Sequence, residues 1–404
     1  MNSFFTDIAK YAFALLAMLI FASAGTVSAQ SGVSSLPSPV LINASSKTVG
    51  TDIWATETEI RVGQSAPFTG ASGEIGKQLR MGADAYFRAV NEQGGVYGRK
   101  IRLVAMDDAS DPTRALANTQ ALIETEKVFA LLGYFGAAPS AASVPVFTAA
   151  KVPFISPVTG AASLRTPFNP YIFNTRANHD DEAHAIVKYL AEAPRNKRIA
   201  VFYQDDASGE SGLVSVEKAL KEFNLALAGK AAFKPGSTDI AVAARILATA
   251  APQTVIMISN YKASAQLVKT MRAMRVPTQF WSFSADGGQL LSAELGTYGS
   301  GVGVAQVVPF PGLNYMQLAV EHRAAIGEKD ITFHTLEGYL AAKVFVEGLR
   351  RAGKSPTREL FVKGLEGAGK LDLGGYAVQF SPTDHGGSNF VDLSMIAKNG
   401  KFVR

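Results

Sequence analysis

Short apolar runs alternate with longer stretches of helical spacing along most of the chain beyond residue 58. Runs of four to eight apolar residues that end at Gly, Pro, Asp or Ser are typical of buried strands. Stretches in which apolar residues recur at intervals of three and four are typical of amphipathic helices. Regular alternation of the two predicts an α/β fold with doubly wound, mainly parallel sheets.

The alternation runs through two similar series, followed by a less regular C-terminal third. The first series predicts strands at 60–68, 101–106, 129–132 and 152–155, with helices that end near Asn91, begin at the N-cap Asp111 and span 141–150. The second predicts strands at 198–203, 226–233, 254–259 and 278–283, with helices at 180–191, 213–223, 238–248 and 264–274. The last third predicts a strand at 301–308, helices at 315–326 and 336–351, and β-structure at 376–380 and 390–397. Two similar α/β lobes therefore explain the pattern better than one large sheet does.

Residues 129–161 are the stretch around which the first series is arranged. They read as strand, loop, helix, strand and loop, which is a βαβ unit. Because both strands point the same way, the loops 133–140 and 156–160 are expected at the carboxyl edge of the sheet, where open α/β folds bind ligands. Small side chains in these loops leave backbone N–H groups accessible to a carboxylate, and the following helix adds its positive end.

Composition narrows the possible classes of protein. At 404 residues the chain exceeds the size at which one core keeps growing, so two domains are expected. The absence of cysteine excludes disulfides, thiolate catalysis, Cys-type zinc sites and a lipidated N-terminal Cys. Although the formal net charge is +5, Lys and Arg are scattered and no basic run is interleaved with aromatic residues. We therefore expect no nucleic-acid partner.

The N-terminus has the pattern of an export signal. Lys10 precedes an apolar run at 11–24, and Val27-Ser28-Ala29 is a small-x-small cleavage signature, so cleavage is expected near Ala29. The run falls short of the roughly 20 residues that a membrane anchor needs, and no later stretch reaches that length. After a flexible leader at 30–57, rich in Ser, Thr and Pro, the mature protein is expected to be periplasmic or secreted, without membrane insertion.

The sequence contains no constellation typical of an enzyme or a cofactor site. Gly70, Gly73 and Gly76 follow the order GxxGxxG rather than the GxGxxG of dinucleotide loops. The five histidines form no HExxH motif, and no GxSxG follows a strand. The sequence therefore predicts neither catalysis, nor a cofactor, nor a metal site.

Several of these segments together resemble a known family. Residues 61–76, the turn at 91–101, Asp107-Asp108, the loop at 133–136 and Ser163-Leu164-Arg165 are similar to the periplasmic Leu/Ile/Val-binding proteins, the type I solute-binding components of branched-chain amino acid ABC importers. The resemblance extends over residues 59–404. It implies two lobes joined by three crossovers, which close around a ligand by hinge motion.

The resemblance also implies domain boundaries. Lobe one would comprise 58–176 plus 308–387, and lobe two 177–307 plus 388–404. The hinges would lie near 174–178, 306–309 and 387–389.

The same resemblance implies a ligand site. The carboxylate of an amino acid would be held by the two loops at Ala137, Ala138, Val158, Thr159 and Gly160. Where the family has a hydroxyl at the first of these positions, this chain has Ala137, so Thr159, Ser140, Ser156 or the amides alone would have to serve. The remaining implied ligand positions are Ile75, Ser208, Tyr261, Ser284, Asp286 and Glu337.

Three departures from the family pattern bear on the ligand. Ile75 and Ser208 stand where the family has aromatic residues, and Ser284 stands near the family's acidic acceptor for the ligand's ammonium. An ammonium buried without an acceptor costs several kcal/mol. The open alternatives are an aliphatic or aromatic carboxylate, an amide, or an amino acid held by Asp286 or Glu337.

The implied partners are a small-molecule ligand and the permease of an ABC importer, with the protein itself a monomer. A sensor of the same fold that signals to a membrane receptor is the alternative function.

Overall fold

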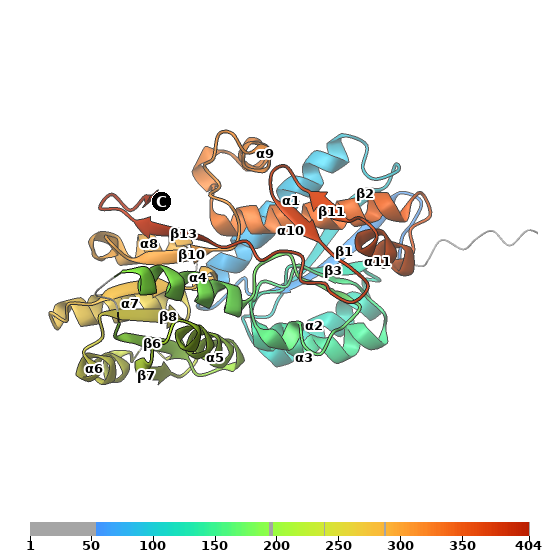
Figure 1. Cartoon of the computed structure of the whole chain (residues 1–404). Coiled ribbons are helices and arrows are strands. Elements are labelled where there is room, and N and C mark those ends of the chain that lie inside the picture. Colours follow the sequence, from blue (N-terminus) through green and yellow to red (C-terminus); the bar gives the residue numbers. More distant parts are fainter. Residues whose placement is uncertain (1–53, 194–196, 238, 287, 404) are drawn as a thin grey trace, which may run out of the picture. The chain divides into compact units, whose positions relative to one another are not determined.

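Two mainly parallel β-sheets organise the part of the chain that the computed structural model describes, residues 54–193, 197–237, 239–286 and 288–403 (Figure 1). One sheet has five parallel strands in the order β2-β1-β3-β4-β5. The other has seven strands in the order β14-β13-β10-β9-β8-β6-β7, of which β13 and β14 are antiparallel to their neighbours. The predicted α/β class with mainly parallel sheets is confirmed. The predicted signal and most of the leader lie outside the described residues.

The strands are short, and each sheet collects strands that are far apart in the sequence. The first sheet contains β1 (Glu59–Ala66), β2 (Lys100–Asp107), β3 (Ala130–Leu132), β4 (Phe154–Ile155) and β5 (Ile172–Phe173). The second contains β6 (Ile199–Gln204), β7 (Leu227–Phe233), β8 (Thr254–Ile258), β9 (Gln279–Ser282), β10 (Gly303–Gln306), β13 (Asp392–Ile396) and β14 (Phe402–Val403). A separate hairpin pairs β11 (Lys370–Asp372) with β12 (Ala377–Gln379).

Helices cover both faces of each sheet. Those packed on the first sheet are α1 (Gly73–Glu92), α2 (Pro112–Glu124), α3 (Ala137–Ala149), α10 (Phe333–Ala352) and α11 (Arg358–Glu366), while α9 (Gln317–Ile326) packs on α1. Those on the second are α4 (His179–Glu192), α5 (Ala207–Glu222), α6 (Ala241–Ala250), α7 (Tyr261–Ala273) and α8 (Gly288–Leu295). Short 3-10 turns occur at η1 (Ala162–Leu164), η2 (Ser284–Asp286), η3 (Gly296–Gly299) and η4 (Glu328–Asp330).

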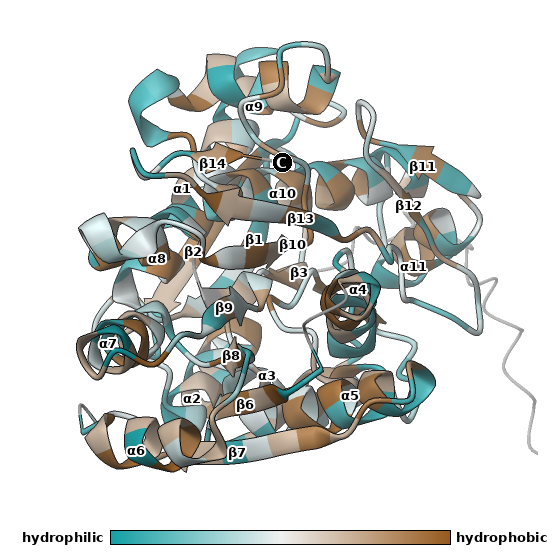
Figure 2. Cartoon of the chain, turned by 60° about the vertical axis from the view of Figure 1, so that its left-hand side comes forward, coloured by the Kyte–Doolittle hydropathy of each residue, from teal (hydrophilic) through white to brown (hydrophobic). Residues whose placement is uncertain are grey.

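Strand β3 is continuously apolar because both of its faces are buried. In β3, Ala130 and Leu132 pack towards α1 and α10, whereas Leu131 packs towards α2 and α3. Side chains alternate between the two faces of a strand, so a strand covered on both faces has no polar positions to offer. Helices α4, α5 and α7 instead alternate between hydrophilic and hydrophobic segments (Figure 2), which is the pattern of one buried face.

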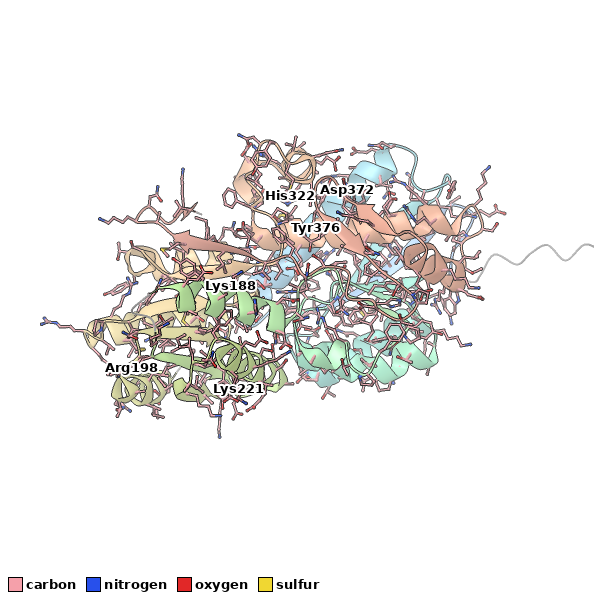
Figure 3. All side chains as sticks on the ribbon, in the orientation of Figure 1. Lys188, Arg198, Lys221, His322, Asp372 and Tyr376 are labelled. Carbon is pink, nitrogen blue, oxygen red and sulfur yellow. The ribbon has the colours of Figure 1, made fainter. Side chains whose placement is uncertain are left out.

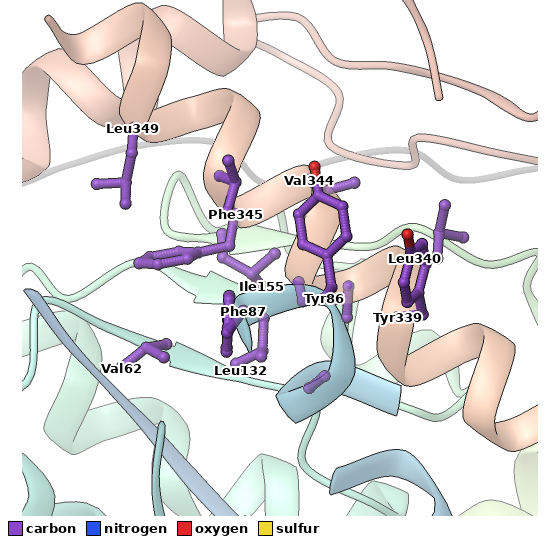
Figure 4. Close-up of a cluster of buried hydrophobic side chains, with 14 of the residues drawn as sticks. Val62, Tyr86, Phe87, Leu132, Ile155, Tyr339, Leu340, Val344, Phe345 and Leu349 are labelled. Carbon is purple, nitrogen blue, oxygen red and sulfur yellow. The ribbon is translucent and has the colours of Figure 1, made fainter. Parts of the chain in front are cut away.

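Helices α1 and α10 cross closely on the first sheet. Tyr86 and Tyr339 meet edge to face with ring centroids 4.9 Å apart, and Phe87 meets Phe345 in the same way (Figure 4). At the crossing itself a Cβ added to Gly338 would lie 2.0 Å from the carbonyl oxygen of Leu79. Only glycine allows the two backbones to approach this far.

Gly338→Ala is therefore expected to lower the free energy of unfolding by about 1 to 3 kcal/mol, the usual cost of overpacking, because the neighbouring backbone cannot yield as a side chain does. Urea unfolding of the variant measures the loss. Val242→Ala, on α6, is the control for a change of side-chain size at a helical position that is exposed to solvent. A loss for Gly338→Ala no larger than for this control would contradict the close crossing.

Several helix boundaries differ from the sequence prediction. Helix α3 begins at Ala137 rather than at residue 141, and α5 begins at Ala207 rather than at 213. In α5 the carboxylate of Asp206 accepts the N–H groups of Ser208 and Gly209, which starts a helix inside a segment predicted as loop. Helices α8 and α11 were not predicted. The capping of α2 by Asp111, with Pro112 in the first turn, is confirmed.

Within the described residues, no helix has both the length and the apolar character that crossing a membrane requires.

Candidate ligand-binding site

The loop after β3 leads directly into the N-terminus of α3. Gly136, with φ of 92°, precedes Ala137 and Ala138 in the first turn, and no side chain caps this end in the described part of the chain. Pro139, the third helical residue, carries no N–H group. The backbone N–H groups of Ala137 and Ala138 therefore form the positive end of α3 and remain for a ligand acceptor.

The loop after β4 lies against this helix start. The N–H of Val158 donates to the carbonyl oxygen of Tyr134 at 2.8 Å, and the N–H of Gly136 donates to the oxygen of Val158 at 3.3 Å. The two loops that the sequence placed at one edge of the sheet are thus hydrogen-bonded to each other.

Three hydroxyl groups near these loops differ in what they contact. Thr159 accepts the N–H of Ala161 within the turn, and Ser156 accepts the hydroxyl of Thr175 at 2.9 Å. The hydroxyl of Ser140 is fully buried and has no hydrogen-bond partner among the described residues. Of the three hydroxyl groups considered from the sequence, Ser140 is the one that stays unsatisfied inside the protein.

Gly160 places the loop after β4 against the start of α4, a helix that packs on the seven-stranded sheet. Its carbonyl oxygen accepts the N–H of His179 at 2.9 Å, and a Cβ at Gly160 would lie 2.2 Å from the His179 ring. The His179 ring in turn lies 3.2 Å from the hydroxyl of Ser211 on α5 and 5.5 Å from the ring of Phe283, the residue before Ser284. His179 therefore contacts Gly160 on one side and lies beside Phe283 on the other.

Apolar side chains pack around the loop after β4. Ile75 on α1, Val158 in the loop and Tyr261 at the start of α7 belong to one buried apolar cluster, with Phe135 packed at its edge. Burial, together with the carboxylates of Glu294 and Glu74, raises the pKa of the Tyr261 phenol, so this side chain is neutral at ordinary pH. An apolar ligand body would fit such surroundings better than a polar one.

A buried charged cluster adjoins these residues. Arg176, only 2% exposed, donates to the hydroxyl of Ser284 and lies 3.6 Å from the carboxylate of Glu182 and 3.3 Å from that of Glu337. The carboxylate of Glu182 also accepts the N–H of Ser284 at 2.7 Å. We call these residues, Arg176, Glu182, Ser284 and Glu337, the Arg176 cluster.

Burial dominates the electrostatics of this cluster. It raises the pKa of the Glu182 and Glu337 carboxyls, and the nearby Arg176 guanidinium partly opposes that rise. It lowers the pKa of His179 and of His334 to about 3, with Arg176 adding to the effect. Both histidines are therefore neutral at physiological pH.

The structure unites most, but not all, of the predicted ligand positions. Ile75, Val158 and Tyr261 share the apolar cluster, and Ser284 and Glu337 share contact with Arg176. Ser208 instead lies in the first turn of α5, where its N–H donates to Asp206, and among the described residues no hydrogen bond joins its side chain to the other positions. The side chain of Asp286 lies outside the described residues.

The sequence prediction missed Arg176, Glu182 and His179. The available signal was Arg176 itself, an arginine that directly follows the extended segment at 171–175 in a predicted hinge. Asp107 and Asp108 have structural roles in the loops beside β2. Asp107 accepts the N–H groups of Phe68 and Ala109, whose hydrogen bonds help to lower the pKa of its carboxyl to about 2 against the opposing effect of burial.

Three chain segments that connect the sheets are tied together beside this region. The hydroxyl of Tyr376, labelled in Figure 3, lies 2.8 Å from the carbonyl oxygen of Thr175 and 3.2 Å from that of Val307. The third segment joins through the N–H of Gly387, which donates to the oxygen of Asn174 at 2.8 Å. Residues of all three crossovers are thus joined by hydrogen bonds at one place.

Known proteins resemble this chain over most of its length. Residues 59–401 match the family described as periplasmic binding protein. An amino acid binding protein of Pseudomonas aeruginosa is 27% identical over 161 residues, which are 40% of this chain and 43% of that protein. The Leu/Ile/Val-binding protein homolog 7 of Brucella suis is 26% identical, with 72% of this chain and 77% of that protein covered.

A solved structure of a periplasmic protein also resembles this chain. The substrate-binding periplasmic protein from Ralstonia solanacearum is 31% identical and superimposes with a TM-score of 0.80, covering 85% of this chain and 99% of that one. The matched family consists of extracytoplasmic binding proteins rather than enzymes. The chain belongs to the family of periplasmic binding proteins.

Proposed function

We propose that the protein captures a small amino acid or a related carboxylate outside the cytoplasm and delivers it to an ABC importer. The observation that carries this proposal is the convergence of the two loops with the free helix start at Ala137 and Ala138 and the buried wall of Ile75, Val158 and Tyr261. The relatives include an amino acid binding protein and a Leu/Ile/Val-binding protein homologue, which supports the same class of ligand.

The ligand would lie with its carboxylate on the first turn of α3. The N–H groups of Ala137 and Ala138 are hydrogen-bond donors without a capping side chain, and the helix end favours negative charge. The Ser140 hydroxyl is a further donor. The apolar body of the ligand would then lie against Val158 and Tyr261.

Closure requires two lobes that move about the crossovers. We assign 58–176 plus 308–387 to lobe one and 177–307 plus 388–404 to lobe two, which places the five-stranded sheet in the first and the seven-stranded sheet in the second. The hydrogen bonds of Tyr376 to Thr175 and Val307 support hinges in these segments. We also propose that the protein is exported with cleavage near Ala29 and acts as a monomer.

A thermal-shift screen of the purified protein tests the proposed function. The candidates are amino acids, aliphatic and aromatic carboxylates, amides and nucleotides. A ligand at 100 times its dissociation constant adds about 2.7 kcal/mol to the free energy of unfolding, which is a clear rise in melting temperature. Stabilisation by carboxylates or amino acids supports the proposal, whereas stabilisation by none of them contradicts it.

Gly160→Ala tests the place of the ligand. The added Cβ would displace His179 and the loop around it, so we expect the affinity for a stabilising ligand to fall at least tenfold. Isothermal titration calorimetry measures the change. The control is Gly364→Ala on α11, where the added Cβ also meets a close neighbour, Arg351, but outside the proposed site. Equal effects of the two variants on affinity would place the ligand elsewhere.

A further inference from the structure

The side chain of Arg176 is almost completely shielded from solvent. Its side chain is 2% exposed, its Nε group makes no hydrogen bond in the described part of the chain, and its Nη1 group has only the ion pair with Glu337 there. A buried guanidinium with unsatisfied N–H groups carries a large free-energy cost, so its surroundings should contain an acceptor in at least one functional state.

Both buried carboxylates that adjoin Arg176 are already engaged with it. Glu337 Oε1 lies 3.3 Å from Nη1, and Glu182 Oε1 lies 3.6 Å from Nη2. The other oxygen of Glu182 accepts the N–H of Ser284, and the hydroxyl of Ser284 accepts from Arg176. A ligand ammonium that approached these acceptors would compete with the guanidinium for the same oxygens.

The Arg176 cluster adjoins the proposed carboxylate site. Arg165, half-buried, donates to the carbonyl oxygens of Thr159 and Ala161 in the ligand loop and to the carbonyl oxygen of Arg176 itself. His179, which touches Gly160, lies close enough to both arginines for them to disfavour its protonated form. The ligand loop is therefore in contact with the guanidinium of Arg165, and it adjoins the Arg176 cluster through His179 and the backbone of Arg176.

Among the described residues, no buried carboxylate of this region is left free for a further cation. The carboxylates of Glu182 and Glu337 both lie against Arg176, and the carboxylate of the half-buried Asp181 accepts the N–H of Asn178. An α-amino acid holds its ammonium within about 3 Å of its carboxylate, so an ammonium at the loop would be buried without a free carboxylate to accept it, which carries a large free-energy cost. A carboxylate without an ammonium needs no such acceptor, and the start of α3 favours its negative charge.

We infer that Arg176 determines the charge class of the ligand and that the site takes a monocarboxylate with an apolar body and no α-ammonium group. The inference rests on the proposed function and narrows its ligand class. Arg176 acts as an internal cation beside Ser284 and Glu337 and so excludes zwitterionic amino acids.

Matched pairs of ligands test this inference on the unaltered protein. The pairs are leucine with 4-methylpentanoate and phenylalanine with 3-phenylpropanoate, which differ only in the ammonium group. We expect the carboxylate of at least one pair to bind at least tenfold more tightly than its amino acid in isothermal titration calorimetry. Tighter binding of the amino acids overturns the inference and leaves the proposed function intact. If neither the amino acids nor the matched carboxylates stabilise the protein, both the inference and the proposed function are overturned.

Arg176→Met separates specificity from a merely structural role. If this variant folds, the ratio between the dissociation constants of the amino acid and its matched carboxylate should fall at least tenfold. Arg198→Met, which removes an exposed arginine that donates to Ala250, should leave that ratio unchanged. An Arg176 variant that loses stability but keeps the ratio overturns the inference. If it does not fold, the matched pairs on the unaltered protein still decide.

Discussion

Arg176→Met is expected to lower the free energy of unfolding by about 3 to 5 kcal/mol, the range for breaking a buried ion pair by removing one partner. The variant leaves the carboxylates of Glu182 and Glu337 inside the protein without their cation. Two like charges then share a region that already disfavours ionised carboxyls, as the raised pKa of each group indicates. Urea unfolding at pH 7.5 measures the loss.

The double variant Arg176→Met with Glu337→Gln identifies the cause. Because the amide carries no charge, the second substitution should recover part of the stability that the first removes. Arg80→Met, which breaks an exposed pair with Asp84, serves as control and should cost less than about 1 kcal/mol. If Arg176→Met costs no more than Arg80→Met, the cluster does not hold the structure in the way its geometry indicates.

The two-sheet fold could be predicted from the sequence because its strands are buried on both faces and end at turn residues. The hydrophobic pattern locates β3, β4, β6 and β8 to within two residues. It misses α11 and the early starts of α3 and α5, because these depend on a cap or on the environment rather than on apolar spacing. Asp206 starts α5 through two hydrogen bonds that local sequence only permits.

The candidate site, too, could be predicted only in part from the sequence. The loops at Val158 and Gly160 follow from the rule that ligands bind at the carboxyl ends of parallel strands. The Arg176 cluster does not follow from any such rule, since Arg176, Glu182, Ser284 and Glu337 are up to 161 positions apart and meet only in the folded chain. The sequence marked Ser284 and Glu337 separately as possible ligand contacts. Their shared contact with Arg176, which the sequence does not reveal, changes the role that we infer for both residues.

A second large effect is expected with pH. His179, His322 and His334 are buried, and burial is the main reason that their pKa values fall to about 3, about 4 and about 3. In the unfolded chain a histidine has a pKa near 6.5, so between about pH 6.5 and pH 4 the unfolded state binds more protons than the native state. The free energy of unfolding should therefore fall as the pH falls through this window, by about 2 kcal/mol for each histidine between pH 7 and pH 5.

Glu182 and Glu337 act in the opposite direction. Their raised pKa values mean that the native state takes up protons before the unfolded state does, so this contribution gains stability as the pH falls. The net loss on acidification should therefore be smaller than the sum over the three histidines.

His322→Gln isolates one histidine from this balance. His322 lies on α9, its Nε2 is 3.0 Å from the hydroxyl of Thr335, and Arg323 is the charged neighbour that adds to its lowered pKa. Its removal should therefore leave the carboxylates of the Arg176 cluster unchanged. Urea unfolding at pH 7.5, 6 and 5 should give a decline in stability that is shallower than in the unaltered protein by about 1 kcal/mol per pH unit between pH 6 and 5. Parallel declines in the two proteins would mean that His322 takes up its proton as readily in the folded as in the unfolded chain, contrary to its burial.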